Sequence, residues 1–102
     1  MDYKHSLDVS LRRLSRLERK SFSSQKRFKF YSYLSEILEY RDQLDRTGEL
    51  LAVRDVLLRR PGCSSKSTDP VRVLIDATSR ANAKTKSRWT RALQFAIDNR
   101  PS

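Results

Sequence analysis

Residues that interrupt helices are scarce in this chain, and their scarcity limits the fold more than any other feature of the sequence. Two glycines and three prolines occur among 102 residues, which is too few for a chain built from many tight turns. Leu, Arg, Lys, Ala and Glu are frequent, and these residues favour helix. The sequence therefore predicts an all-α fold, a small bundle of four to five helices.

The first predicted helix covers residues 6–20. Its apolar stripe spans only about two heptads, which is short for an independent coiled coil. The stripe consists of Leu7, Leu11, Leu14 and Leu17 or Glu18. Such a helix is expected to pack on the body, to pair with a second copy or to become ordered on a ligand. We therefore divide the chain into a basic N-terminal helix or arm, residues 1–23, and a helical domain, residues 24–102.

The second predicted helix, residues 24–46, is expected to be the longest. Apolar residues recur along it at helical spacing and form a wide aromatic and aliphatic face. Its aromatic side chains are expected to belong to the core rather than to stack on bases. They are Phe28, Phe30, Tyr31, Tyr33 and Tyr40. Thr47 and Gly48 end the helix, and Gly48 is well placed for a left-handed cap.

Two shorter helices are predicted next, separated by a loop over residues 61–68. Residues 49–60 form one of them, with Leu50, Val53 and Leu57 on its apolar stripe. Asp69 and Pro70 start the other, as an acidic cap followed by proline at the first helical position. Its apolar stripe is Val71, Leu74, Ile75 and Thr78. A short strand is the alternative there, because β-branched residues are frequent, but a lone strand would have no partner.

The last predicted helix, residues 83–99, has two chemically different sides when residues are placed at 100° intervals. The predicted core side consists of Thr85, Trp89, Ala92, Leu93 and Ala96. The predicted outer side consists of Lys84, Ser87, Arg88, Arg91 and Gln94. The small residues Ala92 and Ala96 would let this helix pack closely on the preceding one.

Three cations of the outer side form a row at i, i+4 and i+7. They are Lys84, Arg88 and Arg91, and no acidic residue follows until Asp98. Surface helices usually mix signs, because like charges at this spacing are mildly unfavourable. Binding an anion is one reason to keep such a row, and Arg, Lys and Gln can hydrogen-bond the edges of bases.

The two C-terminal helices also have the layout of a helix-turn-helix. A short helix, a four-residue connection and a longer basic helix follow one another, and in that motif the second helix enters the major groove. Residues 79–82 contain no glycine, so we expect Asn82 to supply a left-handed conformation. Lys66 and Thr68, with Ser67, precede the first helix and are expected to reach phosphate.

The charge of the whole chain agrees with a polyanionic partner. Twenty-two Lys and Arg residues stand against twelve Asp and Glu residues, a formal net charge of +10, which attracts polyanions. A basic N-terminal cluster is expected to grip phosphates, because each neutralised phosphate adds sequence-independent affinity; a solvated helix face is the alternative. The cluster is Arg12, Arg13, Arg16, Arg19, Lys20, Lys26, Arg27 and Lys29.

Other kinds of site lack the necessary residues. Cys63 is the only cysteine and His5 the only histidine, so disulfide, cysteine-based zinc and histidine-based catalytic sites are excluded. No glycine-rich phosphate loop or nucleophile elbow occurs. The acidic residues of the middle helices are expected to be a solvated face or salt-bridge partners. We predict no enzyme activity, cofactor, metal or small-molecule substrate.

The expected location is the cytoplasm, and the nucleoid if the protein is bacterial. No run approaches the ~18 apolar residues that a membrane span needs. The N-terminus lacks the apolar core of a secretory signal, and a free thiol fits a reducing compartment. No membrane partner is predicted.

These observations favour a small DNA-binding protein, a transcriptional regulator or accessory factor of bacterial or mobile-element type. Its expected partner is duplex DNA, and a homodimer through the two N-terminal helices would suit a two-fold site. Two alternatives remain open, a protein-interaction adaptor that docks an acidic partner and an RNA-binding protein.

Overall fold

Five helices make up the described part of the chain, and no strand occurs in it. The computed structural model describes residues 3–24, 29–60 and 65–100, without the side chains of residues 3–6. The helices are α1 (Tyr3–Ser23), α2 (Tyr31–Thr47), α3 (Leu50–Leu58), α4 (Pro70–Thr78) and α5 (Ala83–Asp98). The predicted all-α bundle is therefore confirmed. Three residues of the sequence predictions, Lys26, Arg27 and Phe28, lie outside the described ranges, as does Cys63.

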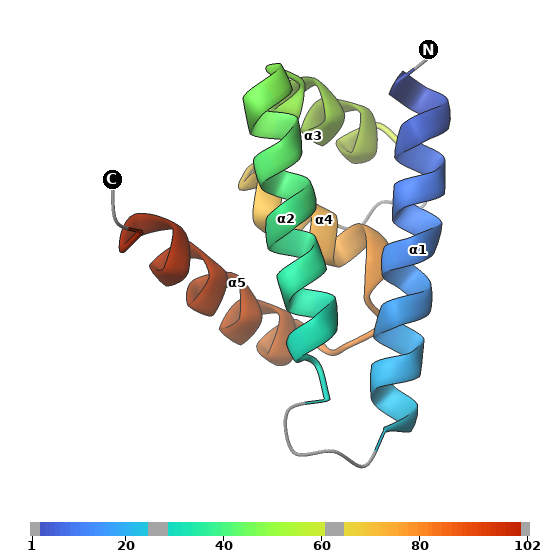
Figure 1. Cartoon of the computed structure of the whole chain (residues 1–102), viewed down its shortest axis with the longest axis vertical. Coiled ribbons are helices and arrows are strands. Elements are labelled where there is room, and N and C mark those ends of the chain that lie inside the picture. The colour runs from blue at the N-terminus through green and yellow to red at the C-terminus, as the bar shows by residue number, and fades with distance from the viewer. Residues whose placement is uncertain (1–2, 25–28, 61–64, 101–102) are drawn as a thin grey trace.

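The helices are arranged around α4. Helices α1 and α2 run antiparallel beside each other, α3 lies across one end of the pair, and α5 slants away on the other side of α2 from α1 (Figure 1). Helix α4 contacts α1, α2, α3 and α5. The fold is thus a shell of four helices packed on a short central one.

Helix α4 is short and apolar on almost every side. It begins where the sequence predicted, because the Asp69 carboxylate accepts a hydrogen bond of 3.0 Å from the Val71 N–H and Pro70 occupies the first turn. Its buried residues are Val71, Val73, Leu74, Ile75 and Thr78. A helix that is mostly apolar and buried belongs to the core of a fold, and the strand alternative for this segment is wrong.

The first helix is longer than predicted, and the second is shorter. Helix α1 has 21 residues and α2 has 17, so α1 is the longest helix. The prediction ended the first helix at Lys20, before three serines that favour helix less. Instead, the Ser21 and Ser23 hydroxyls donate to the carbonyls of Leu17 and Arg19, the back-bonding that lets serine remain inside a helix.

The leucine stripe of α1 is part of the main core. Leu7, Leu11 and Leu14 are buried in the same cluster as the apolar residues of the other helices. Of the three alternatives that the sequence left open for this helix, the structure shows packing on the body. The stripe is consequently occupied within a single chain.

The end of α2 and the stripe of α3 follow local sequence rules. Gly48 has a φ of 75°, the left-handed cap that was predicted. Leu50, Val53 and Leu57 are all buried, as their spacing predicted.

The aromatic residues of α2 divide between the core and the surface. Tyr33 is fully buried, and Phe30 and Tyr40 are partly buried against the core. Tyr31, however, is 73% exposed, so its prediction as a core residue is wrong. Two residues along a helix correspond to about 200°, and Tyr31 therefore faces away from the side on which Tyr33 is buried.

We expect Leu74→Ala to lower the free energy of unfolding by roughly 2–5 kcal/mol, because it removes buried methyl groups and leaves a cavity at the centre. Leu51→Ala makes the same chemical change at a side chain that is 58% exposed and should stay within about 0.5 kcal/mol of the wild type. Urea unfolding measures both. Equal effects would contradict a core centred on α4.

A buried hydroxyl pair joins α2 to the end of α4. The Tyr33 and Thr78 hydroxyl oxygens lie 2.6 Å apart, and the Thr78 hydroxyl also donates to the Leu74 carbonyl at 2.8 Å. Because threonine has a single hydroxyl proton, Tyr33 donates and Thr78 accepts. Burial raises the pKa of Tyr33, and the charges of Glu18 and Asp76 raise it further, against a lowering by the hydrogen bond to Thr78.

This raised pKa predicts a loss of stability at high pH. An unfolded tyrosine ionises near pH 10, whereas folded Tyr33 keeps its proton to higher pH, so the free energy of unfolding falls as pH rises above about 10. The slope approaches about 1.4 kcal/mol per pH unit for one proton. Tyr33→Phe should unfold with a shallower dependence over the same range. Identical slopes would contradict this burial of the hydroxyl.

Candidate nucleic-acid interface

Helix α5 begins with a side-chain cap and an extended connection. The Asn82 side chain accepts a hydrogen bond of 2.8 Å from the Thr85 N–H, and its backbone is extended, with φ −71° and ψ 164°. The predicted left-handed Asn82 is therefore wrong. The residue acts as the helix cap, a role that asparagine fills well.

A buried carboxylate of α1 holds the connection between α4 and α5. The Glu18 side chain is 1% exposed, and its Oε2 accepts a hydrogen bond of 2.6 Å from the Arg80 N–H. This contact satisfies a backbone donor that would otherwise have no partner in a turn without glycine. Sequence reasoning counted Glu18 only as a possible member of an apolar stripe and missed this role. A carboxylate within a leucine stripe was the available signal.

The inner side of α5 is anchored by its tryptophan. Trp89 is 8% exposed, and its ring centroid lies 4.9 Å from that of Phe30 and 5.8 Å from that of Tyr33. Leu93 is also buried. The predicted role of Trp89 as the anchor of this helix is confirmed.

A polar flank of α5 is bonded to α4 and to the loop before it. Arg72 of α4 donates to the Ser87 hydroxyl at 2.8 Å, and the Lys86 ammonium lies 3.3 Å from the Asp76 carboxylate. Further along, the Gln94 amide nitrogen lies 2.7 and 2.8 Å from the two carboxylate oxygens of Asp69. The expected outward position of Ser87 and Gln94 is thus wrong. Their polar groups find partners inside the protein.

These contacts turn a different set of side chains outward. Lys84, Arg88 and Arg91 are exposed as predicted, but Ala92 and Ala96 are exposed as well, and their prediction as core residues is wrong. Phe95 is 69% exposed on the same side. Compared with the predicted orientation, α5 is rotated about its own axis, because its polar flank faces α4 and its alanines do not. We call Lys84, Arg88, Arg91, Ala92 and Phe95 the α5 face.

The three cations of the α5 face are not neutralised. Over residues 3–24, 29–60 and 65–100, no carboxylate lies within 4.0 Å of the charged groups of Lys84, Arg88 or Arg91. Many other basic side chains do have such partners. They are Arg13, Arg41, Arg54, Arg60, Arg72, Lys86 and Arg100. The protein thus uses its few carboxylates in internal contacts and leaves α5 positively charged.

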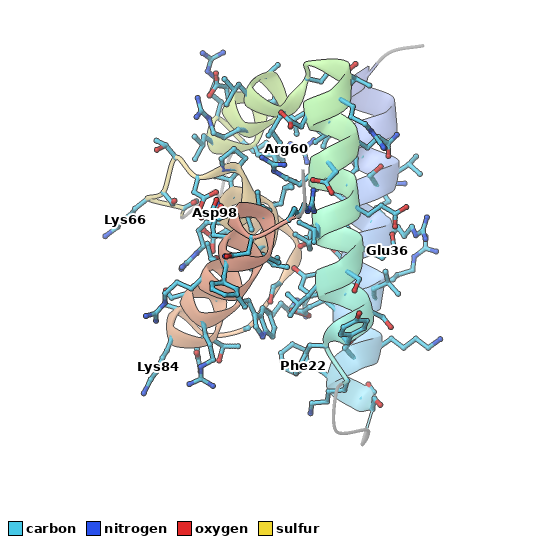
Figure 2. The ribbon with its side chains drawn as sticks, turned by 60° about the vertical axis from the view of Figure 1, so that its left-hand side comes forward. Phe22, Glu36, Arg60, Lys66, Lys84 and Asp98 are labelled. Carbon is cyan, nitrogen blue, oxygen red and sulfur yellow. The ribbon has the colours of Figure 1, made fainter. Side chains whose placement is uncertain are left out.

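The loop before α4 adds one exposed cation on the same side. Lys66 and Lys84 both project away from α1 and α2 (Figure 2). Lys66 borders a groove of about 560 Å³ that is also lined by Arg72, Ala83 and Lys86. Thr68 is exposed, and its carbonyl accepts a hydrogen bond of 3.2 Å from Arg54. The structure therefore brings Lys66 to the same groove as Ala83 and Lys86 at the start of α5.

The predicted arginines of α1 belong to a separate surface. Helices α1 and α5 lie on opposite sides of α2 (Figure 1). Arg12 and Arg16 are exposed, with no ion pair to a described carboxylate, whereas Arg13 pairs with Glu36 at 3.2 Å. Two positive surfaces are present, and only one of them includes α5.

The far end of α5 is also fixed. Arg100, just beyond the helix, lies 2.7 Å from the Asp42 carboxylate of α2. Partial burial would raise the pKa of Asp42, but hydrogen bonds from Arg100 and Arg41 outweigh this effect and lower the pKa below its usual value. The acidic residues of α2 were predicted as a solvated face or salt-bridge partners, and Asp42 is a salt-bridge partner.

Among the described residues, no three His, Cys, Asp or Glu side chains gather where they could hold a metal ion. Their helices include none with the length and apolar character needed to cross a bilayer. No family model, curated protein or solved structure matches the chain.

We expect Gln94→Glu to destabilise the protein, because a second carboxylate would then face Asp69 at hydrogen-bond distance. The free energy of unfolding should be lower than that of the wild type at neutral pH. The difference should shrink as the pH falls toward about 4, because one proton can then be shared between the two carboxyl groups. Thermal unfolding at several pH values measures this. A variant as stable as the wild type at pH 7 would show that Gln94 faces solvent.

Proposed function

We propose that this protein binds duplex DNA through the α5 face and acts as a transcriptional regulator or accessory factor. The observation that supports the proposal most strongly is the unneutralised row of Lys84, Arg88 and Arg91. Like charges at this spacing are unfavourable in an isolated helix, and phosphate or guanine edges would remove the repulsion.

The arrangement of α4 and α5 supports a helix-turn-helix-like reading of this pair. The helices have nine and 16 residues and are joined by residues 79–82. Under the proposal, α5 lies in the major groove with Arg88 and Arg91 at base edges. Lys66 and Thr68 of the preceding loop contact phosphates and position the protein on the duplex.

Two predicted contacts have a changed role in this proposal. Ser87 and Gln94 were expected to face the duplex, but Arg72 and Asp69 engage them. We assign them to holding α5 at its angle. The base contacts are then made by the arginines of the α5 face and by its exposed apolar residues.

The α1 arginines have a supporting role. Because α1 lies on the other side of α2 from α5 (Figure 1), one straight duplex along the α5 face does not reach Arg12 and Arg16. We propose that they contact phosphates of a curved or second DNA segment, without reading sequence. A pair of protein molecules on a two-fold site would serve the same purpose.

Selection from random duplex DNA, followed by fluorescence anisotropy at ~0.15 M salt, tests the proposal. Arg88→Ala with Arg91→Ala should lower affinity for the selected duplex about ten-fold or more and relax its sequence preference, since each bidentate contact contributes roughly 1–3 kcal/mol. Arg12→Ala with Arg16→Ala should weaken binding evenly across sequences and reduce its salt dependence.

A matched control removes the same net charge elsewhere. Arg46→Ala with Arg59→Ala changes two exposed arginines of α2 and the end of α3 and should alter affinity only slightly. The proposal fails if this control weakens binding as much as the α5 variant, or if no duplex is retained. Tighter binding to structured RNA or to an acidic protein would favour one of the two alternative functions instead.

A further inference from the structure

Phe95 has no structural role that explains its position. The ring is 69% exposed, although exposing an aromatic side chain is unfavourable. It is outside the core cluster and the aromatic contacts that hold Trp89. Its neighbours on the exposed side of the helix, Ala92 and Ala96, are also apolar. On the exposed side of α5, the row of cations is therefore followed by an apolar surface toward the end of the helix.

The spacing of the exposed residues makes one continuous contact strip. Arg88, Arg91, Ala92 and Phe95 occupy positions i, i+3, i+4 and i+7, and all four are exposed. Side chains at these offsets share one face of a helix. Recognition helices that lie in the major groove present their base-contacting residues at this spacing.

An exposed apolar patch can bind a second copy of the protein, a lipid bilayer or another ligand. The charge around Phe95 favours a polyanion over the first two. The chain carries a formal net charge of +10, and Arg88 and Arg91 lie within two turns of the ring, so two copies meeting at this face would repel each other. One phenylalanine with two alanines is also a small apolar area for stable binding to a bilayer. A nucleic acid accommodates both the cations and the ring.

We infer that Phe95 reads a thymine methyl group close to the guanines contacted by Arg88 and Arg91. This inference rests on the proposed function. A phenyl ring and a methyl group neither donate nor accept hydrogen bonds, and the 5-methyl of thymine is the apolar group that bases present in the major groove.

Helix geometry limits where the thymine lies. Arg91 and Phe95 are four residues apart, which is about 6 Å along the helix axis. One base-pair step of a duplex is about 3.4 Å. An α5 axis parallel to the duplex axis would span about two base-pair steps between these residues, and an inclined axis would span fewer, so the contacted thymine lies within about two base-pair steps of a guanine.

Replacing thymine by deoxyuridine in the selected duplex tests the inference, because it removes one methyl group and leaves charge and pairing unchanged. Affinity of the wild type should fall about three- to five-fold for each contacted thymine. Phe95→Ala should bind the thymine and uracil duplexes equally. Tyr31→Ala, at an aromatic ring that is 73% exposed at the start of α2, is the matched control and should keep the full discrimination.

The outcomes separate this inference from the proposed function. If Arg88→Ala with Arg91→Ala loses affinity but uracil has no effect on the wild type, thymine reading is overturned and duplex binding stands. If Phe95→Ala weakens both duplexes and discriminates between them as the wild type does, the ring does not read the methyl group. Tighter binding to a single strand that depends on Phe95 would assign the ring to base stacking and overturn the inference. If the wild type binds no duplex, both proposals fail.

Discussion

The central position of α4 is the constraint on which the rest of the structure depends. Its nine residues contact all four other helices, so each of these helices buries apolar side chains against one short element. Such a helix gains its stability from packing rather than from its length. The sequence provides for this with an acidic cap, a proline in the first turn and apolar residues that follow on nearly every side.

The polar residues near α4 determine which side of α5 is exposed. Asp69 caps α4 through the Val71 N–H and also accepts from Gln94, so one carboxylate fixes the start of one helix and the rotation of another. Asp76 binds both Arg72 and Lys86 in a similar way. Because these carboxylates are engaged inside the protein, they are not available to neutralise Arg88 and Arg91. The positions of these acidic residues therefore account both for the internal contacts and for the positive charge of the α5 face.

Sequence reasoning succeeded where a structure depends on local chemistry. The cap at Asp69, the left-handed Gly48 and the buried Trp89 each follow from residue type and spacing. It failed where the outcome depends on partners distant in sequence. Ala92 looked like a packing residue by size, but Asp69, 25 residues from Gln94, decides the rotation of α5. Glu18 acts 62 residues away at Arg80, and no local pattern indicates that contact. Phe95 was overlooked, although its position at i+7 from Arg88 places it on the predicted outer side, because only polar side chains were considered there.

Helix α5 is fastened at both ends, by Glu18 to the backbone at Arg80 and by Arg100 to Asp42. A hinge motion that followed the shape of a ligand would break the hydrogen bonds of the extended connection before it. A rigid reading helix loses little conformational entropy when it docks. Under the proposed function, the adjustment falls to the duplex, whose stiffness depends on base sequence. The mechanical properties of DNA would therefore contribute to selectivity even at positions that no side chain touches.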